Sequence, residues 1–280
     1  MTSERRRIWV LDGSVAGTGA LVSAREMACA LSEDTDVVLA LPDTAQIAAE
    51  ELSDFAEVHY LPIRPLRRRA WDVVTYVPFL LLTSYRLRRL MWRDGSDILL
   101  VNDFYLIQGP LLRLLGYRGH ILTWIRIDPT NFGRMGDIWL AVTAKMSDQI
   151  VSVSRHIQEL LPKSISSNLL YDAVSRDFLQ ISRPPNQINY DFVFIGNYIE
   201  GKGHEVAITA FAEILQDFPA ARLRFFGGDM GLVKNREYRS ALEEQASYLG
   251  VAEAVTFGDS VPSPWTVLGT GFAALNLSKS

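Results

Sequence analysis

The chain has 280 residues, of which 48% are apolar and 21% charged, proportions that are typical of a globular protein with room for two domains. Its formal net charge of -4 gives no electrostatic reason to expect a nucleic-acid partner. The single cysteine, Cys29, excludes an internal disulfide, and the four histidines lack metal-ligand spacing, so no metal site is expected. The apolar run after the first arginines ends at Gly13 and is too short for a signal peptide, which predicts a cytoplasmic protein.

The first part of the chain alternates short apolar runs with helical patterns. Strands are expected at residues 8–12, 36–41, 57–61, 97–102, 120–127 and 149–154. Helices are expected at 21–31 and 44–52, with further helical segments near 105–115, 135–146 and 155–161. This alternation predicts an α/β fold with a doubly wound, mostly parallel sheet.

A glycine-rich turn follows the first strand, with Gly13, Gly17 and Gly19 in the spacing G-x3-G-x-G. This spacing differs from the dinucleotide fingerprint G-x-G-x-x-G, and no acidic residue ends the second strand to hold a ribose, although Asp43 is near. Because glycine lacks a Cβ atom, the turn lets a ligand approach the backbone. It could equally serve to pack the helix on the strand, and the sequence leaves both interpretations open.

Residues 64–94 form an apolar stretch bracketed by arginines. From Trp71 to Tyr85 it is shorter than the roughly 20 residues needed to span a bilayer, and Asp72 lies inside it. One interpretation is a pair of helices, broken near Pro78 and packed on the sheet with the arginines in solvent. The other is contact with an anionic membrane surface through the basic and aromatic residues Arg67, Arg68, Arg69, Arg86, Arg88, Arg89, Arg93, Trp71 and Trp92.

Polar residues follow two of the expected strands. Asn102 and Asp103 end one, and Arg126 and Asp128 end another, directly before Pro129. Side chains at the carboxyl ends of parallel strands face the ligand in such sheets, so these residues are candidates for contact with an acceptor. Two structural interpretations stay open: Asp103 could cap the next helix, and Asp128 could simply terminate its strand before the proline.

The segment at residues 181–189, ISRPPNQIN, is the expected linker to a second domain. Beyond it, residues 191–196 predict a buried parallel strand, 204–218 a helix and 221–226 another strand. Lys202 lies where the connecting loop meets the amino terminus of this helix. Its ammonium group would add to the helix dipole and the unpaired backbone N–H groups, which suits a pyrophosphate. The alternative is an ordinary solvated lysine.

Several motifs of this second half occur together and in one order. They are FIG-x5-KG from Phe194, the helix AITAFAEIL, the strand ARLRFFGGD, the helix YRSALEEQASYLGV and the strand AVTFGDSV. As a set they resemble the second domain of family 4 glycosyltransferases, which have the GT-B fold, over most of residues 191–280. The resemblance implies two Rossmann-like domains, an acceptor-side domain at residues 1–182 and a partial nucleotide-sugar-binding domain at 190–280.

The resemblance also assigns residues to a site. The donor contacts that it implies are Gly196, Asn197, Lys202, Gly203, Gly13, Gly17, Gly19, Val255, Phe257 and Gly258. The last three of these would border the base, although Phe257 could also be an ordinary core residue. The acceptor contacts would be Asn102, Asp103 and Arg126, with Asp128 as the catalytic candidate. The family pattern implies neither a metal nor a cofactor besides the nucleotide-sugar donor.

Three departures from the family pattern bear on activity. Asn197 stands where members frequently have an arginine, which weakens charge compensation of the phosphates. Ile125 and Arg126 occupy the strand end at which many members carry a histidine, so no catalytic histidine is implied. The sequence ends at Ser280, before the two glutamates that lie near the donor sugar in family members. We therefore expect an incomplete second domain, and no sugar transfer by the 280 residues alone.

The function that the resemblance implies is retaining transfer of a sugar from a nucleotide-sugar donor to a glycan or lipid-linked acceptor, in cell-envelope or polysaccharide biosynthesis. Peripheral contact with the inner face of the membrane through residues 64–94 stays open. The alternative from another class is a GT-B-like module that binds a nucleotide sugar or a membrane without catalysis. A nicotinamide-dependent oxidoreductase would share the sheet architecture, but the missing fingerprint argues against it.

Overall fold

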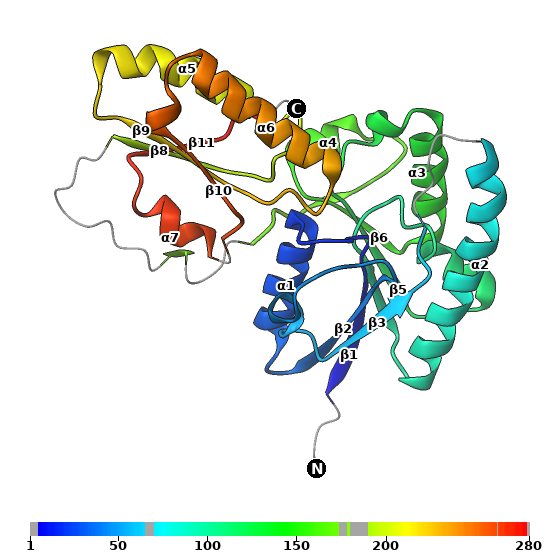
Figure 1. Cartoon of the computed structure of the whole chain (residues 1–280). Helices are drawn as coiled ribbons and strands as arrows, with labels where there is room; N and C mark the ends of the chain where they lie inside the picture. The colour runs from blue at the N-terminus through cyan, green and yellow to red at the C-terminus, as the bar shows by residue number, and fades with distance from the viewer. Residues whose placement is uncertain (1–4, 65–69, 174–177, 180–189, 262, 279–280) are drawn as a thin grey trace. The chain divides into compact units, whose positions relative to one another are not determined.

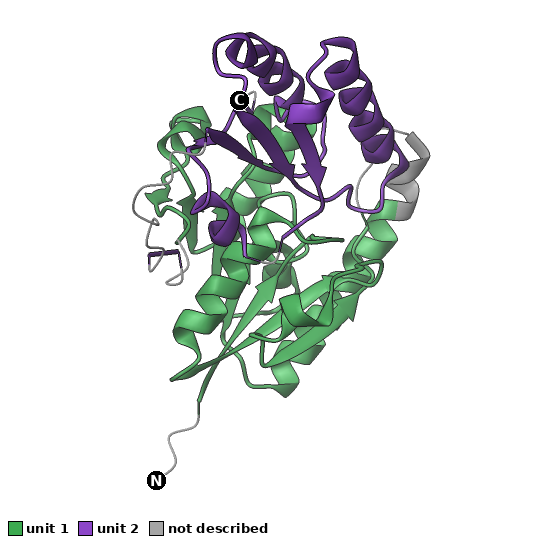
Figure 2. Cartoon of the chain, turned by 60° about the vertical axis from the view of Figure 1, so that its left-hand side comes forward, with its two compact units in different colours: residues 1–173 green, residues 174–280 purple. Residues whose placement is uncertain are grey.

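The computed structural model describes residues 5–64, 70–173, 178–179, 190–261 and 263–278. The chain forms two compact units, residues 1–173 (unit 1) and residues 174–280 (unit 2), shown in Figure 2. The linker expected at residues 181–189 lies outside the described residues. Each unit contains its own parallel sheet.

Unit 1 contains a seven-stranded parallel sheet in the order β3-β2-β1-β4-β5-β6-β7 (Figure 1). Its strands are β1 (Arg6–Leu11), β2 (Thr35–Pro42), β3 (Glu57–Leu61), β4 (Ile98–Val101), β5 (His120–Ile125), β6 (Gln149–Ser152) and β7 (Asn168–Leu169). The first six confirm the strands expected from the sequence, to within about two residues at each end. The sequence prediction misses β7, because a strand of two residues is too short to show a hydrophobic period.

The helices of unit 1 are α1 (Gly19–Leu31), α2 (Ala70–Arg93), α3 (Arg134–Met146) and α4 (Arg155–Leu160), with 3-10 turns η1 (Ala49–Leu52), η2 (Pro110–Leu115) and η3 (Pro129–Phe132). The helix expected at 44–52 is wrong, since only η1 at its end is helical. The N–H of Gln46 donates to Val15 O at 2.8 Å, so this backbone is tied to the glycine-rich turn and not to a helical carbonyl. Near 105–115 the described helix is likewise short and begins only at Pro110, which has no N–H to donate.

The segment that the sequence divides at Pro78 is one continuous helix, α2, so the expected break is wrong. Buried side chains lie on both sides of the proline, including Tyr76 before it and Leu87 after it. The hydroxyl of Thr83 donates to Pro62 O at 3.0 Å and fixes the helix further. This packing outweighs the roughly 3 kcal/mol that a proline costs inside a helix. Across the described part of the chain, no helix combines the length and hydropathy required to cross a bilayer.

Helices cover both faces of the unit 1 sheet, because alternate residues of each strand point to opposite sides. Trp9 of β1 packs with Leu87 of α2 in one buried cluster, whereas Val10 packs with Leu21 of α1 in another. From β1, the strands β2 and β3 follow toward one edge of the sheet, whereas β4 and the later strands follow toward the other edge. The strand order therefore reverses between β1 and β4, which pair in parallel. In doubly wound sheets, ligands bind beyond the carboxyl ends of the strands at such a switch point.

Unit 2 contains a four-stranded parallel sheet in the order β10-β9-β8-β11. Its strands are β8 (Asp191–Ile195), β9 (Arg222–Phe226), β10 (Val255–Gly258) and β11 (Ala273–Leu275), and its helices are α5 (His204–Asp217), α6 (Val233–Tyr248) and α7 (Pro264–Leu268), with a 3-10 turn η5 (Ala252–Ala254). Figure 1 draws α5 and α6 on one side of these strands and α7 on the other. The strand order reverses between β8 and β11, which pair in parallel, so the switch point of unit 2 lies between these two strands. The α/β fold class, with two Rossmann-like parallel-sheet units, is thereby established.

Candidate functional site

The loops that follow β8 and β9 are tied together by hydrogen bonds. The N–H of Gly196 donates to Phe226 O at 2.9 Å, and the N–H of Tyr198 donates to Gly228 O at 3.0 Å. Asn197 joins the same contact, because its Oδ1 accepts from the N–H of Gly228 at 3.0 Å. The amide of Asn197 therefore holds the two loops together at the carboxyl ends of their strands.

Two glycines shape the loop before α5. Gly201 and Gly203 have φ values of 91° and 89°, a left-handed conformation that side chains other than glycine adopt at a cost. A Cβ atom on Gly203 would also collide with the backbone oxygen of Leu277, which follows β11. Gly203 thus permits the close approach that places the amino terminus of α5 beside the end of β11, at the switch point of unit 2.

Lys202 is exposed on this loop, one residue before Gly203. Within the residues that the structure describes, its ammonium group makes no hydrogen bond and no ion pair. The first N–H groups of an α-helix have no helical partner, and the helix dipole is positive at this end. The loop therefore offers an unengaged cation and a positive helix end on the ligand side of the sheet, a combination that favours an anion such as a diphosphate.

His204, the first residue of α5, is buried and was not identified from the sequence. Its Nε2 lies 3.3 Å from Gly196 O, and because a carbonyl only accepts, Nε2 carries the hydrogen. The ring packs against Phe194 with centroids 4.4 Å apart, and burial lowers the pKa of the imidazole, which favours its neutral form. The neutral ring links the start of α5 to the end of β8 and so fixes the shape of the loop that carries Lys202.

The residues expected to border a base lie at the end of β10 and are bonded to their neighbours. Val255 is buried, and Phe257 stacks on Phe225 with centroids 5.2 Å apart. Gly258 O accepts from the hydroxyl of Tyr198 at 2.7 Å. These contacts support the core interpretation of Phe257, and its contact with a base stays a prediction.

In unit 1, a buried polar network connects the carboxyl ends of β1, β4 and β5. Asn102 donates to the carboxylate of Asp12, and its Oδ1 accepts from Nε of Arg126 at 2.6 Å. Nη1 of Arg126 donates to both carboxylate oxygens of Asp172, at 2.7 and 2.9 Å, and Nη2 donates to Ser23 Oγ at 3.0 Å. The Arg126 side chain is only 6% exposed, and each of its three nitrogen atoms donates to another residue of unit 1. The network therefore positions groups at the switch point of unit 1, and direct contact of Arg126 with an acceptor stays a prediction.

Asp103 is almost fully buried beside this network. Its Oδ1 accepts from the N–H of Phe104 at 2.8 Å and from the N–H of Arg126 at 3.3 Å, so it links the turn after β4 to the end of β5. The capping interpretation is wrong, because the next helical turn, η2, begins at Pro110 and has Gly109 at its N-cap. Burial raises the pKa of the carboxyl to about 7, although both hydrogen bonds act in the opposite direction. Asn102, Asp103 and Arg126 are thus brought together, as the sequence predicts for one sheet edge.

The raised pKa of Asp103 predicts a pH-dependent stability. Between its ordinary 3.8 and about 7, the folded protein keeps a proton that the unfolded chain has lost. The stabilisation is complete below pH 3.8 and is lost as the pH rises to 7, by up to about 4 kcal/mol. In urea unfolding we expect lower stability at about pH 7.5 than at about pH 5, and Asp103→Asn should remove most of this difference. An equal difference in the wild type and the variant would contradict the assignment.

Asp128 caps the 3-10 turn η3. Its Oδ1 accepts from the N–H of Thr130 at 2.8 Å and from the Thr130 hydroxyl at 2.7 Å. These hydrogen bonds lower the pKa of the carboxyl and keep it ionised. The sequence left open that Asp128 simply terminates its strand before Pro129, and the structure gives it a local structural role there as the N-cap of η3. Its catalytic role stays a prediction.

The glycine-rich turn of unit 1 is occupied by side chains of its own unit. A Cβ atom on Gly13 would lie 3.0 Å from the hydroxyl of Tyr105, and one on Gly17 would lie 2.7 Å from Oε2 of Glu51. Gly19 has open space around it and begins α1. A carboxylate beside Gly17 opposes an approaching phosphate, so the geometry favours the packing interpretation at this position.

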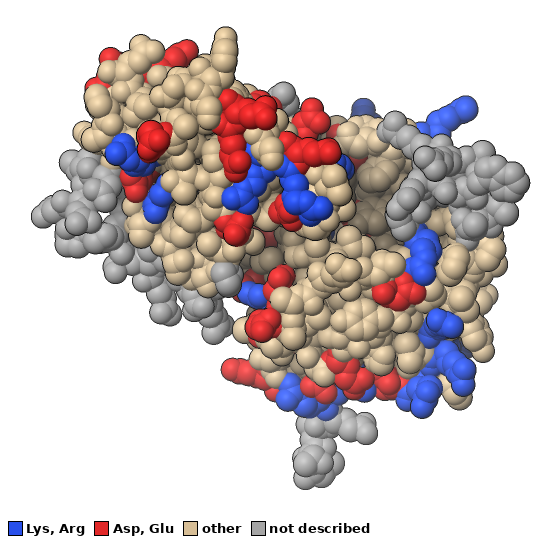
Figure 3. All heavy atoms as spheres, viewed as in Figure 1, with Lys and Arg blue, Asp and Glu red and all other residues tan. Residues whose placement is uncertain are grey.

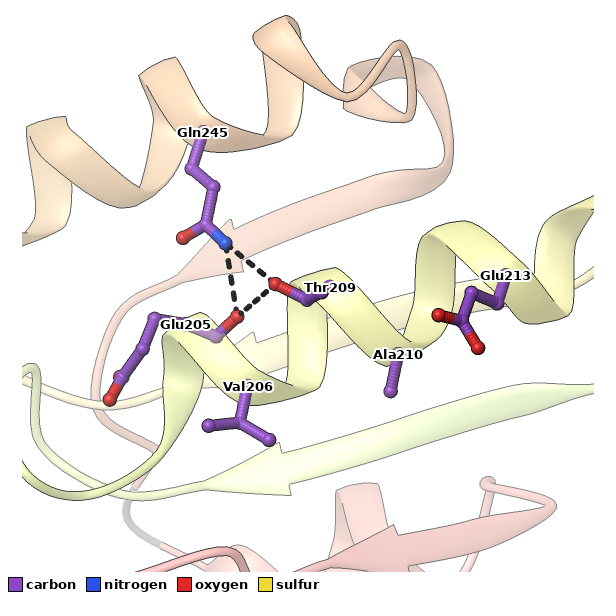
Figure 4. Close-up of a pocket in the computed structure, with 6 residues that line it drawn as sticks. All are labelled: Glu205, Val206, Thr209, Ala210, Glu213 and Gln245. Atoms are coloured by element: carbon purple, nitrogen blue, oxygen red, sulfur yellow. Dashed lines mark hydrogen bonds between the residues drawn. The ribbon is translucent and has the colours of Figure 1, made fainter.

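A shallow hollow of about 350 Å3 lies between α5 and α6 (Figure 4). Gln245 donates there to Glu205 O and to Thr209 Oγ1, both at 3.0 Å. The carboxylates of Glu205 and Glu213 also belong to its lining and would repel a diphosphate. The positive loop at Lys202 is therefore the better candidate for an anionic donor. In the described part of the chain, no group of three or more acidic, histidine or cysteine side chains could hold a metal ion.

Comparison with known proteins finds no matching family model and no matching curated protein. The structure is similar to that of HepE from Anabaena, crystallised with UDP and glucose, with a TM-score of 0.74 and 14% identity over 99% of this chain and 75% of that one. A glycosyltransferase from Rickettsia africae gives a TM-score of 0.69 at 11% identity, covering 99% and 74% of the two chains. Sucrose-phosphate synthase from Thermosynechococcus elongatus gives 0.64 at 12% identity, covering 95% and 73%. The chain therefore has a fold like that of GT-B glycosyltransferases.

Proposed function

We propose that this chain is a glycosyltransferase whose unit 2 binds a nucleotide-sugar donor. The observation that carries the proposal is the unengaged Lys202 at the amino terminus of α5, at the switch point between β8 and β11. A fold similar to that of HepE, which was crystallised with UDP and glucose, supports the same donor class. The sugar would pass to a glycan or lipid-linked acceptor, in cell-envelope or polysaccharide biosynthesis.

In the proposed reaction, the bond between the sugar and the diphosphate breaks while an acceptor hydroxyl attacks the sugar and gives its proton to a base, for which the ionised Asp128 is the candidate. Lys202 and the first N–H groups of α5 would stabilise the negative charge that develops on the departing diphosphate. Charge compensation by these groups, without a metal, and retention of the sugar's configuration rest on the sequence resemblance. Unit 1 would present the acceptor, with the network around Arg126 holding the strand ends in place and Asp128 as the candidate catalytic carboxylate.

One observation favours a second candidate function, a module that binds a nucleotide sugar without transferring it. Asn197 carries no charge, and its Oδ1 is already engaged with the N–H of Gly228. Lys202 is then the one cationic side chain on the loop between β8 and α5. With less positive charge than an arginine at position 197 would give, the loop would stabilise a departing diphosphate less, so it would bind a donor more readily than it would cleave one.

The donor assignment predicts a selective effect of Lys202→Ala. A hydrogen bond to a charged group contributes about 1.5–3 kcal/mol, so the dissociation constant for UDP or UDP-glucose should rise roughly 10- to 150-fold. The free energy of unfolding should hardly change, because an exposed loop lysine adds little to it. Isothermal titration calorimetry and urea unfolding measure the two quantities.

Arg222→Gln provides the matched control. Arg222 begins β9 and so lies at the amino ends of the strands, whereas the α5 loop lies at their carboxyl ends. This variant also removes one positive charge from unit 2 but should leave nucleotide affinity unchanged. If Lys202→Ala and the wild type bind UDP equally well, or if both variants lose the same affinity, the donor site does not lie at the α5 loop.

A further inference from the structure

Helix α2 presents two apolar faces, of which the sheet covers only one. Tyr76, Leu87 and other residues of the first face are buried. On the other side of the helix, Leu81 is 60% and Trp92 is 72% exposed, and Val77 and Tyr85 are exposed on the same side. At 3.6 residues per turn, these four side chains fall within about 80° of the helix circumference. We call Val77, Leu81, Tyr85 and Trp92 the apolar stripe of α2.

A row of arginines runs beside this stripe. Arg86, Arg89 and Arg93 are exposed and lie three or four residues apart, on adjacent turns of α2. Together with Tyr60 and Leu61 of the edge strand β3, they line a hollow of about 310 Å3. In Figure 3, blue side chains gather at the lower right of the molecule, where Figure 1 draws the end of α2. Three arginines therefore line one small hollow, next to the exposed apolar stripe of α2.

These arginines are not held in ion pairs, although the charge of Arg86, after the hydrogen bond from Arg64, helps to lower the pKa of the Asp43 carboxyl. In the part of the chain that the structure describes, none of the three side chains forms an ion pair or a hydrogen bond. The neighbouring carboxylates have other partners, since Asp43 pairs with Arg64 and Glu57 pairs with Arg7. A cavity lined by unpaired guanidinium groups attracts phosphate, which arginine binds through parallel N–H donors.

We propose that α2 docks on the surface of an anionic phospholipid bilayer, with the hollow between α2 and β3 holding a headgroup phosphate. The arginine row would meet the lipid phosphates while the apolar stripe enters the boundary between headgroups and acyl chains. A soluble phosphate would account for the hollow but not for the exposed Leu81 and Trp92 next to it. Arg67, Arg68 and Arg69, which the sequence also suggests for membrane contact, lie outside the described residues.

Vesicle sedimentation tests this proposal with the full chain. We expect binding to vesicles of phosphatidylcholine with about 30% phosphatidylglycerol, and much weaker binding to phosphatidylcholine alone. Raising the salt from about 50 to about 500 mM should weaken binding, because salt screens the arginines. The triple variant Arg86→Gln/Arg89→Gln/Arg93→Gln should lower the partition coefficient about 100-fold, since each surface arginine contributes roughly fivefold. Leu81→Gln should weaken binding severalfold by removing one member of the apolar stripe.

The matched control is Arg118→Gln/Arg134→Gln/Arg155→Gln, which changes three exposed arginines of unit 1 outside α2. Both triple variants take the net charge from -4 to -7, because each removes three positive charges. The proposal is overturned if the wild type does not bind anionic vesicles at low salt, or if both triple variants lose binding equally. Saturable binding of inorganic phosphate without vesicle binding would assign the hollow to a soluble phosphate and overturn it as well. Thermal unfolding of each variant verifies that the fold is retained.

Discussion

Replacing Arg126 by alanine should lower the free energy of unfolding by about 2–4 kcal/mol. The change leaves Oδ1 of Asn102 without its donor at 2.6 Å and removes the two hydrogen bonds to Asp172. Breaking a fully buried pair costs about 3–5 kcal/mol, and the expected loss is smaller because the Asp172 side chain is 45% exposed. Urea unfolding followed by circular dichroism measures the change.

Two further variants separate the network from the mere loss of an arginine. Arg134→Ala removes an exposed arginine of the same unit and should change stability by less than about 0.5 kcal/mol. In a double-mutant cycle, Arg126→Ala and Asp172→Asn should be strongly non-additive because the two side chains contact each other. Additive effects, or a loss no larger than that of Arg134→Ala, would show that the network does not stabilise unit 1.

Gly227→Ala should destabilise unit 2 by about 1–3 kcal/mol or more, the usual range for overpacking. A Cβ atom on Gly227 would collide with the backbone oxygen of Gly196 and lie 3.0 Å from Cα of Asn197. These are backbone atoms of the loop that follows β8, so a side-chain rotation cannot relieve the clash. The variant should also weaken nucleotide binding, because the same two loops form the candidate donor site.

The adjacent glycine supplies the control for this prediction. A Cβ atom on Gly228 would meet Asn197 Oδ1 at 3.5 Å, an ordinary van der Waals contact. Gly228→Ala should therefore retain most of the stability and affinity that Gly227→Ala loses. Equal unfolding free energies for the two variants would mean that the close approach of the β8 and β9 loops is not required.

The sheets were predictable from the sequence because buried parallel strands give short apolar runs that end at polar or glycine residues. Glu57–Leu61 was located without error, and Asp191–Ile195 to within one residue. The errors arise where distant contacts override local signals. The hydrogen bond from Gln46 to Val15 O replaces the helix expected at 44–52, and packing on the sheet keeps α2 continuous through Pro78. Local sequence propensity cannot reveal either contact, because each joins parts of the chain that are distant in sequence.

The candidate site was predictable in part. The loop with Lys202 and Gly203 could be recognised because a glycine–lysine loop between a strand and a helix is a local signal. In unit 1, the proximity of Asn102 and Arg126 was predictable because both follow strands of one parallel sheet. The bond between Arg126 and Asp172 was not, because the two residues lie 46 positions apart and neither shows a motif. His204 was likewise overlooked, since only its burial between β8 and α5 reveals its link to Gly196 O.

Calorimetric titration of the chain with UDP, GDP and NAD tests the central claim most directly. A nucleotide-sugar site built on the α5 loop predicts saturable binding of at least one nucleoside diphosphate and no binding of NAD. The prediction follows from the unengaged Lys202 in unit 2 and from the spacing of Gly13, Gly17 and Gly19, which does not fit a dinucleotide. Binding of NAD, with no heat from UDP or GDP, would contradict the glycosyltransferase account.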